Sequence, residues 1–375
     1  MQHLQQKRLT LLACILFAFT FFFAYPALSQ EAVNSEEKRK ENSNKKTNTE
    51  PKPKRKIAMP VFVSDSNTGY IDNAYIRTRF QIRFDSGSNA NTPDRAEFFY
   101  GACGCARVVP LPPQNTPRPD GEVLNPEAPG PVGPVIPGAI LSSPLIETSL
   151  DYQDIRLDYE HAFNERFSVF VEAPIRFIDG DVIGSTEGLA DVRAGFKWGL
   201  VNSASHQLTF QLKAYLPTGD AEEGLGSDHT SIEPGLLYFR RIDEHWTTSA
   251  ELRYLYSTGG TNGRSTGFDE DYDGDIVRYG LGVGYDFMMS DTTRVTPVLE
   301  LVSWIVLGGL ALESSDGTPM TAQYRQTDGD TITNLKFGLR VNFERDRSIY
   351  IGYGKSLTDE WWYDDIIRAE FRTGF

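Results

Sequence analysis

The sequence predicts an all-β chain, a transmembrane antiparallel up-and-down β-barrel of about twelve strands. From Ala74 onward, apolar and polar residues alternate with period two in about twelve segments, as they do in strands with two unlike faces. The connections between these segments alternate between short and long. Beyond the N-terminus no apolar run is long enough for a spanning helix, so a membrane protein with this sequence would have to cross by strands.

The first segment, residues 76–84, shows the alternation clearly. One face carries Ile76, Thr78, Phe80, Ile82 and Phe84, and the residues between them are arginine or glutamine. The same scheme recurs in residues 154–160, 167–177, 190–200, 207–216, 232–238, 246–256, 277–287, 295–301, 335–343, 349–353 and 367–375. Segments of this length cross a bilayer when the strands are tilted.

The connections favour a membrane barrel over a soluble sandwich. Those after the even-numbered segments are short, such as residues 162–166 and 202–205, whereas most of the others are longer. Outer-membrane barrels have short periplasmic turns and long external loops. Aromatic residues lie near many segment ends, as interfacial girdles require. The last segment alternates down to Phe375 and resembles the terminal signal read by the barrel-assembly machinery, which we therefore expect as a partner.

The N-terminus predicts export. Residues 1–29 form a signal peptide, with basic Lys7 and Arg8, an apolar stretch and small residues around a cleavage site near Ser29. An uncleaved anchor helix is the alternative. Residues 30–73 are predicted to be a charged, disordered linker and lead-in to the barrel, which would comprise residues 74–375. A Pro-rich external loop is expected at about residues 85–147.

Charge and cysteine content narrow the partners and the compartment. The formal net charge is −14, which argues against nucleic acid, because phosphate binding needs a basic surface. After cleavage only Cys103 and Cys105 remain, and they could form a disulfide in an oxidising compartment. The predicted location is the bacterial outer membrane, with outer-membrane lipid around the barrel.

Charged residues on the second face of the segments must point into the barrel. A charge facing lipid at mid-depth costs about 2–4 kcal/mol for arginine or lysine. The predicted lumen-facing residues are Arg77, Arg79, Arg83, Asp158, Glu172, Asp191, Arg193, Lys213, Glu233, Glu251, Arg253, Arg278, Glu300, Arg340, Arg368 and Glu370. They could line a polar path that selects small solutes, or form a salt-bridged filling of a narrow barrel.

Sites for metals, cofactors and catalysis are poorly indicated. Asp269, Asp271 and Asp273 begin like a calcium loop, but Gly280 stands where the bidentate glutamate belongs, so a solvated acidic loop is the preferred interpretation. No cofactor is indicated. His229, next to Ser227, is the one histidine expected at the outer rim, which keeps an outer-membrane hydrolase as an alternative hypothesis.

Residues 188–192 (Gly-Leu-Ala-Asp-Val), 216–220 (Leu-Pro-Thr-Gly-Asp) and 224–227 (Gly-Leu-Gly-Ser) carry a family resemblance. Around them the sequence resembles the transporter family named for the MetA pathway of phenol degradation, over roughly residues 148–375. The resemblance implies an outer-membrane barrel, and some members are linked with uptake of aromatic compounds. We therefore expect a channel for passive passage of small molecules, with aromatic compounds among the candidates. A structural or adhesive barrel with a plugged lumen is the alternative.

Overall fold

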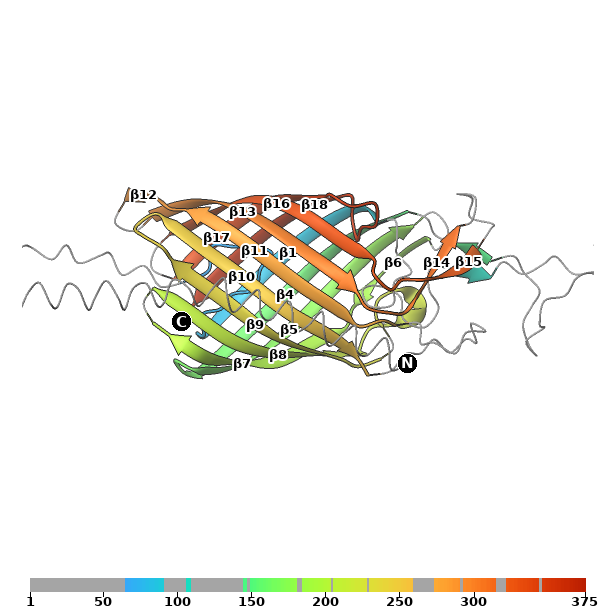
Figure 1. Cartoon of the computed structure of the whole chain (residues 1–375), viewed down its shortest axis with the longest axis horizontal. Helices are drawn as coiled ribbons and strands as arrows, with labels where there is room; N and C mark the ends of the chain where they lie inside the picture. The colour runs from blue at the N-terminus through green and yellow to red at the C-terminus, as the bar shows by residue number, and fades with distance from the viewer. Residues whose placement is uncertain are drawn as a thin grey trace, which may run out of the picture. The chain divides into compact units, whose positions relative to one another are not determined.

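Alternating side chains produce β-strands almost throughout the described chain (Figure 1). The computed structural model describes residues 65–90, 106–108, 144–146, 149–180, 184–203, 205–227, 229–258, 273–290, 293–314, 322–343 and 346–375. The predicted signal peptide, Cys103 and Cys105 lie outside these ranges. No helix within them is long and apolar enough to cross a membrane.

Twelve strands form the wall of the barrel. They are β1 (Arg79–Ala90), β4 (Leu150–Asn164), β5 (Phe167–Gly180), β7 (Val192–Asn202), β8 (His206–Leu216), β9 (Ser231–Arg241), β10 (Trp246–Ser257), β11 (Ile276–Tyr285), β13 (Thr293–Val306), β16 (Thr331–Phe343), β17 (Arg347–Ser356) and β18 (Asp365–Gly374). Each pairs antiparallel with its neighbours. The predicted fold and strand number are confirmed.

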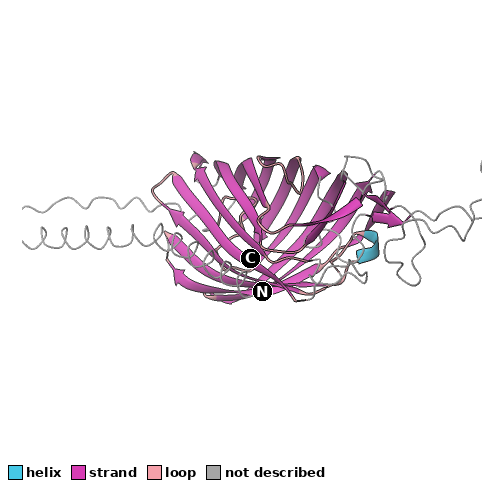
Figure 2. Ribbon diagram, turned by 45° about the vertical axis from the view of Figure 1, so that its right-hand side comes forward, coloured by secondary structure: helices cyan, strands magenta, loops and turns pink. Residues whose placement is uncertain are grey.

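Shorter elements decorate the wall. β6 (Gly184–Leu189) pairs with β5, and β12 (Phe287–Ser290) pairs with β13. Two hairpins stand apart from the main sheet: β2 (Ala106–Val108) with β3 (Pro144–Ile146), and β14 (Leu310–Ser314) with β15 (Ala322–Gln326). The described helix is one short 3₁₀ turn, η1 (Ala221–Glu223), drawn in cyan in Figure 2.

The first and last strands close the barrel. β1 pairs with β18 from Arg79↔Gly374 to Ser88↔Asp365. β11 also pairs with β13, so every strand of the wall has a neighbour on both sides. Closure leaves no edge strand with unpaired backbone N–H and C=O groups. A sheet in lipid requires this because hydrocarbon offers no hydrogen bonds. The register also sets each strand's inner and outer residues.

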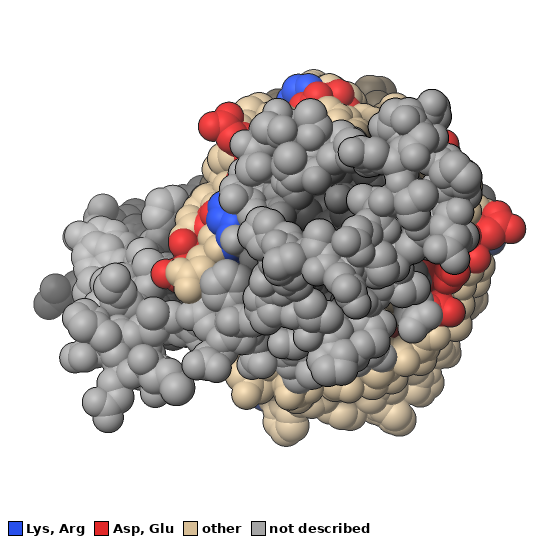
Figure 3. Space-filling model, turned by 90° about the vertical axis from the view of Figure 1, so that its right-hand side faces the viewer, with Lys and Arg blue, Asp and Glu red and all other residues tan. Residues whose placement is uncertain are grey.

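The two ends of the barrel differ in their connections. At one end, here called the short-turn end, only a few residues join β4 to β5, β7 to β8, β9 to β10 and β16 to β17. β12 and the chain's C-terminus lie at this end, and β14 and β15 lie at the opposite, long-loop end (Figure 1). The alternation of loop length predicted from the sequence is confirmed. Acidic side chains (red) stand around the described rim of the long-loop end (Figure 3).

The outer surface of the wall is apolar. Phe337 and Ile351, near the middle of neighbouring strands, are each 60% exposed, and the belt continues through Ile82, Leu157, Val171, Leu281 and Leu299. Aromatic rings gather at the short-turn end, where Phe167 contacts Phe163, Phe196 and Trp198. An apolar belt with aromatic rings at its edge matches a barrel that faces lipid.

Several predicted boundaries are wrong. β1 begins at Arg79 rather than within residues 74–76, and it continues to Ala90, beyond the predicted loop start at 85. Residues 85–90 stay in the strand because they pair with β18 and β4, and because Asp85 binds Arg368 inside the lumen. β4 likewise begins at Leu150, ahead of the predicted residue 154.

Candidate functional site: a filled lumen and its vestibule

The predicted lumen-facing charges mostly lie inside the barrel. Glu251, Glu300 and Arg340 are at most 1% exposed, although they belong to strands whose outer faces are apolar. Also buried or half-buried inside the wall are Arg79, Arg83, Asp158, Glu172, Arg193, Lys213, Glu233, Arg253, Arg278, Arg368 and Glu370. They alternate with the lipid-facing residues, as the strand period requires.

Two of the predicted residues lie at the rims. Arg77 precedes β1 and pairs with Asp346 in the turn between β16 and β17, 2.9 Å away, so it sits at the short-turn end. Asp191 lies just before β7 at the long-loop end. Its carboxylate accepts hydrogen bonds from the backbone of Thr218, Gly219 and Ser227 and holds the β8–β9 loop against the wall.

Residues 65–78, here called the inserted segment, lie within the lumen. Asp65 is near Arg372 at the short-turn end, and the Thr78 carbonyl accepts a hydrogen bond from the Phe375 N–H at the same end. Between them Tyr70 and Ile71 are 3% and 1% exposed. The segment therefore enters and leaves by the short-turn end and turns near Tyr70. The sequence analysis placed residues 65–73 in the linker; in the structure they are packed inside the wall.

The turn of the inserted segment is held by Glu300 of β13. Its carboxylate accepts hydrogen bonds from the backbone N–H groups of Gly69, Tyr70 and Ile71 at 2.9, 3.0 and 2.9 Å. Irregular backbone at membrane depth needs such partners, because an unsatisfied buried N–H costs several kcal/mol. One buried carboxylate thus satisfies three consecutive donors.

Arginines of the wall satisfy the carbonyls of the same limb. Arg340 donates to the Asn67 and Thr68 carbonyls at 2.9 and 2.8 Å, and Arg368 donates to the Gly69 carbonyl at 2.6 Å. The guanidinium groups keep carboxylate partners as well: Arg340 binds Glu370 at 2.7 Å. The charges that the sequence predicts for the lumen therefore bind the inserted segment as well as one another.

The returning limb is held by the opposite part of the wall. The Asp72 carboxylate lies 2.7 Å from Arg253 and 3.2 Å from Lys213. Lys197 donates to the Asn73 carbonyl at 2.9 Å. A gap of about 30 Å³ remains between this limb and the wall, roughly the share of one water molecule. The short-turn half of the lumen is nearly filled.

Tyr350 fixes the height of the turn. Its buried ring lies against Gly69 of the segment and against Gly338 and Gly352 of the wall, where any Cβ atom would overlap the ring. Tyr70 packs edge-on against Tyr350, with ring centres 6.3 Å apart. Glycine is required at these positions by close approach rather than by backbone conformation.

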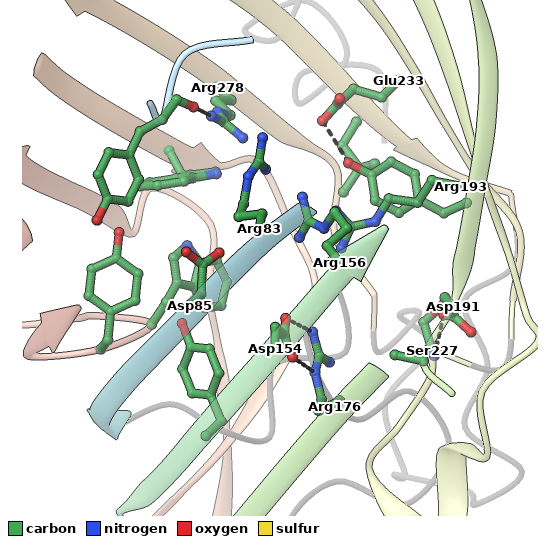
Figure 4. A pocket seen from close by; sticks show the side chains of 18 of the residues that line it. Arg83, Asp85, Asp154, Arg156, Arg176, Asp191, Arg193, Ser227, Glu233 and Arg278 are labelled. Carbon is green, nitrogen blue, oxygen red and sulfur yellow. Dashed lines mark hydrogen bonds and ion pairs between the residues drawn. The ribbon is translucent and has the colours of Figure 1, made fainter. Parts of the chain in front are cut away.

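Above the turn, the long-loop half holds a cavity of about 140 Å³, here called the vestibule. Tyr70 and Asp72 lie at its floor. Its walls combine rings with charges, including Tyr152, Tyr215, Trp304, Trp362, Tyr363, Arg83, Arg156, Arg193 and Lys336. Figure 4 shows Arg83 of β1, Arg156 of β4 and Arg193 of β7 reaching into it. In the same view Asp154 and Arg176 face each other in a two-point contact, at 2.8 and 3.0 Å.

The hydrolase hypothesis is not supported by the geometry at the rim. The Ser227 hydroxyl donates to Asp191 at 2.8 Å, whereas the His229 Nδ1 faces the Ser227 carbonyl at 2.6 Å and Asp273 at 2.9 Å. Serine and histidine are thus not arranged as a nucleophile and its base. Burial alone would lower the pKa of His229, but its hydrogen bond to Asp273 and that group's charge raise the pKa above its ordinary value.

The calcium hypothesis can be followed at only one position. Asp269 and Asp271 lie outside the described residues, and Asp273 faces His229. Among the residues that the structure describes, no group of three or more acidic, histidine or cysteine side chains is arranged to hold a metal ion.

Sequence reasoning missed the inserted segment and several of its partners. Arg156, Lys336 and Tyr350 are not among the predicted lumen-facing residues, although the structure places all three inside the barrel. The available signal was the large number of charged residues on the inward faces of the predicted strands, because such charges need polar partners inside the barrel.

The chain shows remote structural likeness to known proteins. No curated protein sequence matches the chain. Among solved structures, the COG4313 outer membrane channel from Pseudomonas putida F1 is 14% identical, covering 83% of this chain and 100% of that one, with a TM-score of 0.46. The NanC porin is 10% identical, covering 60% and 93%, with a TM-score of 0.37. These likenesses are too distant to bear on function.

The family comparison is stronger. The matching stretch contains the vestibule residues from Tyr152 to Lys336 and the three sequence motifs noted above. Since residues 143–360, more than half of the chain, match the family described as "Putative MetA-pathway of phenol degradation", the chain belongs to that family.

Proposed function

We propose that the protein is a channel of the bacterial outer membrane for passive passage of small molecules, aromatic compounds among them. The observation that carries the proposal is a closed barrel with an apolar outer belt, a charged interior and a vestibule of about 140 Å³. A barrel that only anchors loops has no need of a hollow lined by rings and charges. Membership of a family named for phenol degradation supports the aromatic part of the proposal.

Passage through this channel requires the inserted segment to move. The segment fills the short-turn half of the lumen, and it is held largely by hydrogen bonds and ion pairs such as those of Glu300 and Arg340. Water can replace such bonds one at a time, so their net contribution to stability is modest compared with that of a packed apolar core. The resting channel is closed in this proposal, and displacement of residues 65–78 opens it.

A structural barrel with a permanently plugged lumen is the second candidate. The observation that favours it is the same segment, because the gap beside its returning limb holds only about 30 Å³. The two candidates differ in conductance. A channel conducts once the segment is loosened, whereas a permanently plugged barrel does not, and its function does not depend on the lumen.

Planar-bilayer conductance of the purified full chain separates the candidates. Wild type should conduct weakly, and Glu300→Gln, which weakens the hold on the turn, should open more often and conduct more. Glu187→Gln is the matched control, because Glu187 is exposed on β6 at the long-loop end. If wild type and Glu300→Gln both stay sealed, the channel proposal fails. A liposome-swelling panel of aromatic acids, sugars and amino acids then ranks the solutes.

A further inference from the structure

Three arginines of the vestibule lie farther from their carboxylate partners than most other buried arginines of the lumen do. Arg83 on β1 and Arg156 on β4 are direct register partners, so two like charges face each other across neighbouring strands. Arg193 on β7 stands beside Glu172 of β5 in the same belt of the wall. These three residues are here called the arginine cluster. Like charges directly opposite each other destabilise a sheet unless something compensates them.

The carboxylates near the arginine cluster lie at the outer limit of an ion pair. Arg83 lies 3.4 Å from Glu370 and 4.0 Å from Asp158. Arg156 and Arg193 lie 3.9 and 3.6 Å from the same oxygen of Glu172. The Nε atoms of all three arginines are buried and have no hydrogen-bond partner among the described residues, as is also true of the Arg278 Nε atom. Glu172 is shared further, since its other oxygen lies 3.0 Å from Lys213.

Elsewhere in the lumen the same arrangement is compensated. Arg253 and Arg278 are also register partners, on β10 and β11. Arg253 has Asp72, Glu251 and Glu233 at 2.7, 2.8 and 2.9 Å, and Arg278 has Glu251 at 2.7 Å. The wall can thus supply close carboxylates to an opposed arginine pair. The arginine cluster has no carboxylate closer than 3.4 Å. Five carboxylates do line the cavity, those of Asp72, Asp85, Asp154, Asp191 and Glu233, but seven arginine and lysine side chains line it as well. This excess of positive charge indicates an anionic ligand.

The remaining walls of the vestibule indicate a flat apolar body for that ligand. The Arg193 guanidinium lies 5.0 Å from the centre of the Tyr215 ring. Across the cavity, the Lys336 ammonium lies 3.8 Å from the centre of the Tyr70 ring, with Trp304 and Tyr363 at 5.4 and 5.3 Å. A cavity of about 140 Å³ is close to the roughly 150 Å³ that binds benzene in an engineered protein core.

We propose that the vestibule binds a small single-ring aromatic carboxylate, with its carboxylate on Arg83, Arg156 and Arg193 and its ring against the aromatic walls. Guanidinium groups match a carboxylate because two parallel N–H donors meet two oxygens. Glu172 alone cannot neutralise the positive charges of Arg156, Arg193 and Lys213, and the ligand's carboxylate supplies the additional negative charge. This inference rests on the proposed function for its biological sense, because the ligand would be the solute that enters the channel.

Binding of benzoate to the purified full chain in detergent, measured by calorimetry, tests the inference. Wild type should bind benzoate saturably and more tightly than benzyl alcohol, which lacks the charge, and than cyclohexanecarboxylate, which lacks the aromatic ring. Arg156→Met should weaken benzoate binding about tenfold or more, the loss expected for one charge-assisted hydrogen bond. Arg166→Met is the control, since Arg166 lies exposed in the β4–β5 turn at the other end.

The thermal melting curve guards against a folding defect. Arg156→Met removes one of two opposed like charges, so its melting temperature should equal or exceed that of wild type, while benzoate should stabilise wild type alone. The inference is overturned if benzoate does not bind, if Arg156→Met binds it as wild type does, or if inorganic phosphate competes as well as benzoate. Calorimetry measures benzoate binding independently of transport. A sealed barrel that binds benzoate would contradict only the channel proposal. A conducting barrel that does not bind benzoate would contradict only this inference.

Discussion

Replacing Glu300 by glutamine should release the inserted segment without disturbing the wall. The carboxylate accepts three backbone N–H bonds, from Gly69, Tyr70 and Ile71. A glutamine has one acceptor oxygen, so at least one N–H would face an NH₂ group and the bonds that remain would lose their charge. Hydrogen bonds to charged groups contribute about 1.5–3 kcal/mol each. We therefore expect the docked state to lose about 2–4 kcal/mol, which raises the displaced population roughly 30- to 1,000-fold.

A buried reporter on the segment measures this population. Ser66 is 1% exposed, so Ser66→Cys, with Cys14, Cys103 and Cys105 replaced by serine, should react with a membrane-impermeant maleimide only when the segment leaves. The labelling rate then follows the open population, provided that redocking is faster than labelling. Glu300→Gln should raise that rate by the factor given above.

The control and the refuting result are both defined by the lumen's geometry. Asp154→Asn also neutralises a buried wall carboxylate, but Asp154 binds Arg176 and not the inserted segment, so labelling of Ser66→Cys should stay near the parent rate. If Glu300→Gln labels within twofold of the parent chain, the three backbone bonds do not hold the segment and the reasoning fails.

Three further predictions concern packing, lipid and pH. Gly69→Val should displace the segment and raise bilayer conductance, because its side chain would overlap the Tyr350 ring. Ile351→Arg should lower the free energy of unfolding in lipid vesicles by about 2–4 kcal/mol, because Ile351 is 60% exposed on the outer face. The pKa of His229 is raised, so its contact with Asp273 stabilises the rim fully at pH values below histidine's ordinary pKa of about 6.5. This stabilisation is lost as the pH rises through the raised pKa. Melting temperatures across this pH range measure the loss.

Each of these has its own check. Leu357→Arg, just beyond the end of β17, should cost about 0–1 kcal/mol, and an equal cost for both arginine substitutions would contradict the lipid-facing belt. Asp273→Asn should remove the pH dependence of the melting temperature that is assigned to His229. An unchanged pH profile in that variant would show that another group causes the pH dependence. A sealed Gly69→Val barrel would mean that the segment tolerates the added side chain.

The wall was predictable because a barrel in lipid imposes its period on every strand. Phe337 and Ile351 alternate with Lys336 and Tyr350 whatever the strand's neighbours are, so local sequence suffices. The C-terminal strand could even be placed to its final residues. Boundaries were harder: Ala74 to Thr78 continue the alternation of β1, yet they leave the sheet to form the end of the inserted segment.

The segment itself could not be recognised from its own residues. Apart from Tyr70 and Ile71, the residues from Asp65 to Asn73 are small and polar, as in a linker, so their sequence does not distinguish a solvated stretch from a buried one. Its order comes from Glu300, Arg340 and Arg368, which are more than 200 positions away in the chain. The vestibule was missed for the same reason, because its residues come from strands at both ends of the sequence.

The partners of the inserted segment give its docking a place in the order of assembly. The limb up to Ile71 binds Glu300, Arg340, Arg368 and Arg372, and the last two belong to the final strand. Residues 66–71, which precede every strand of the wall, therefore obtain all their hydrogen bonds only after the last strand has joined the barrel. A nascent barrel that lacks β18 would leave the Ser66 and Gly69 carbonyls without their guanidinium donors, so a docked segment distinguishes a finished barrel from an unfinished one.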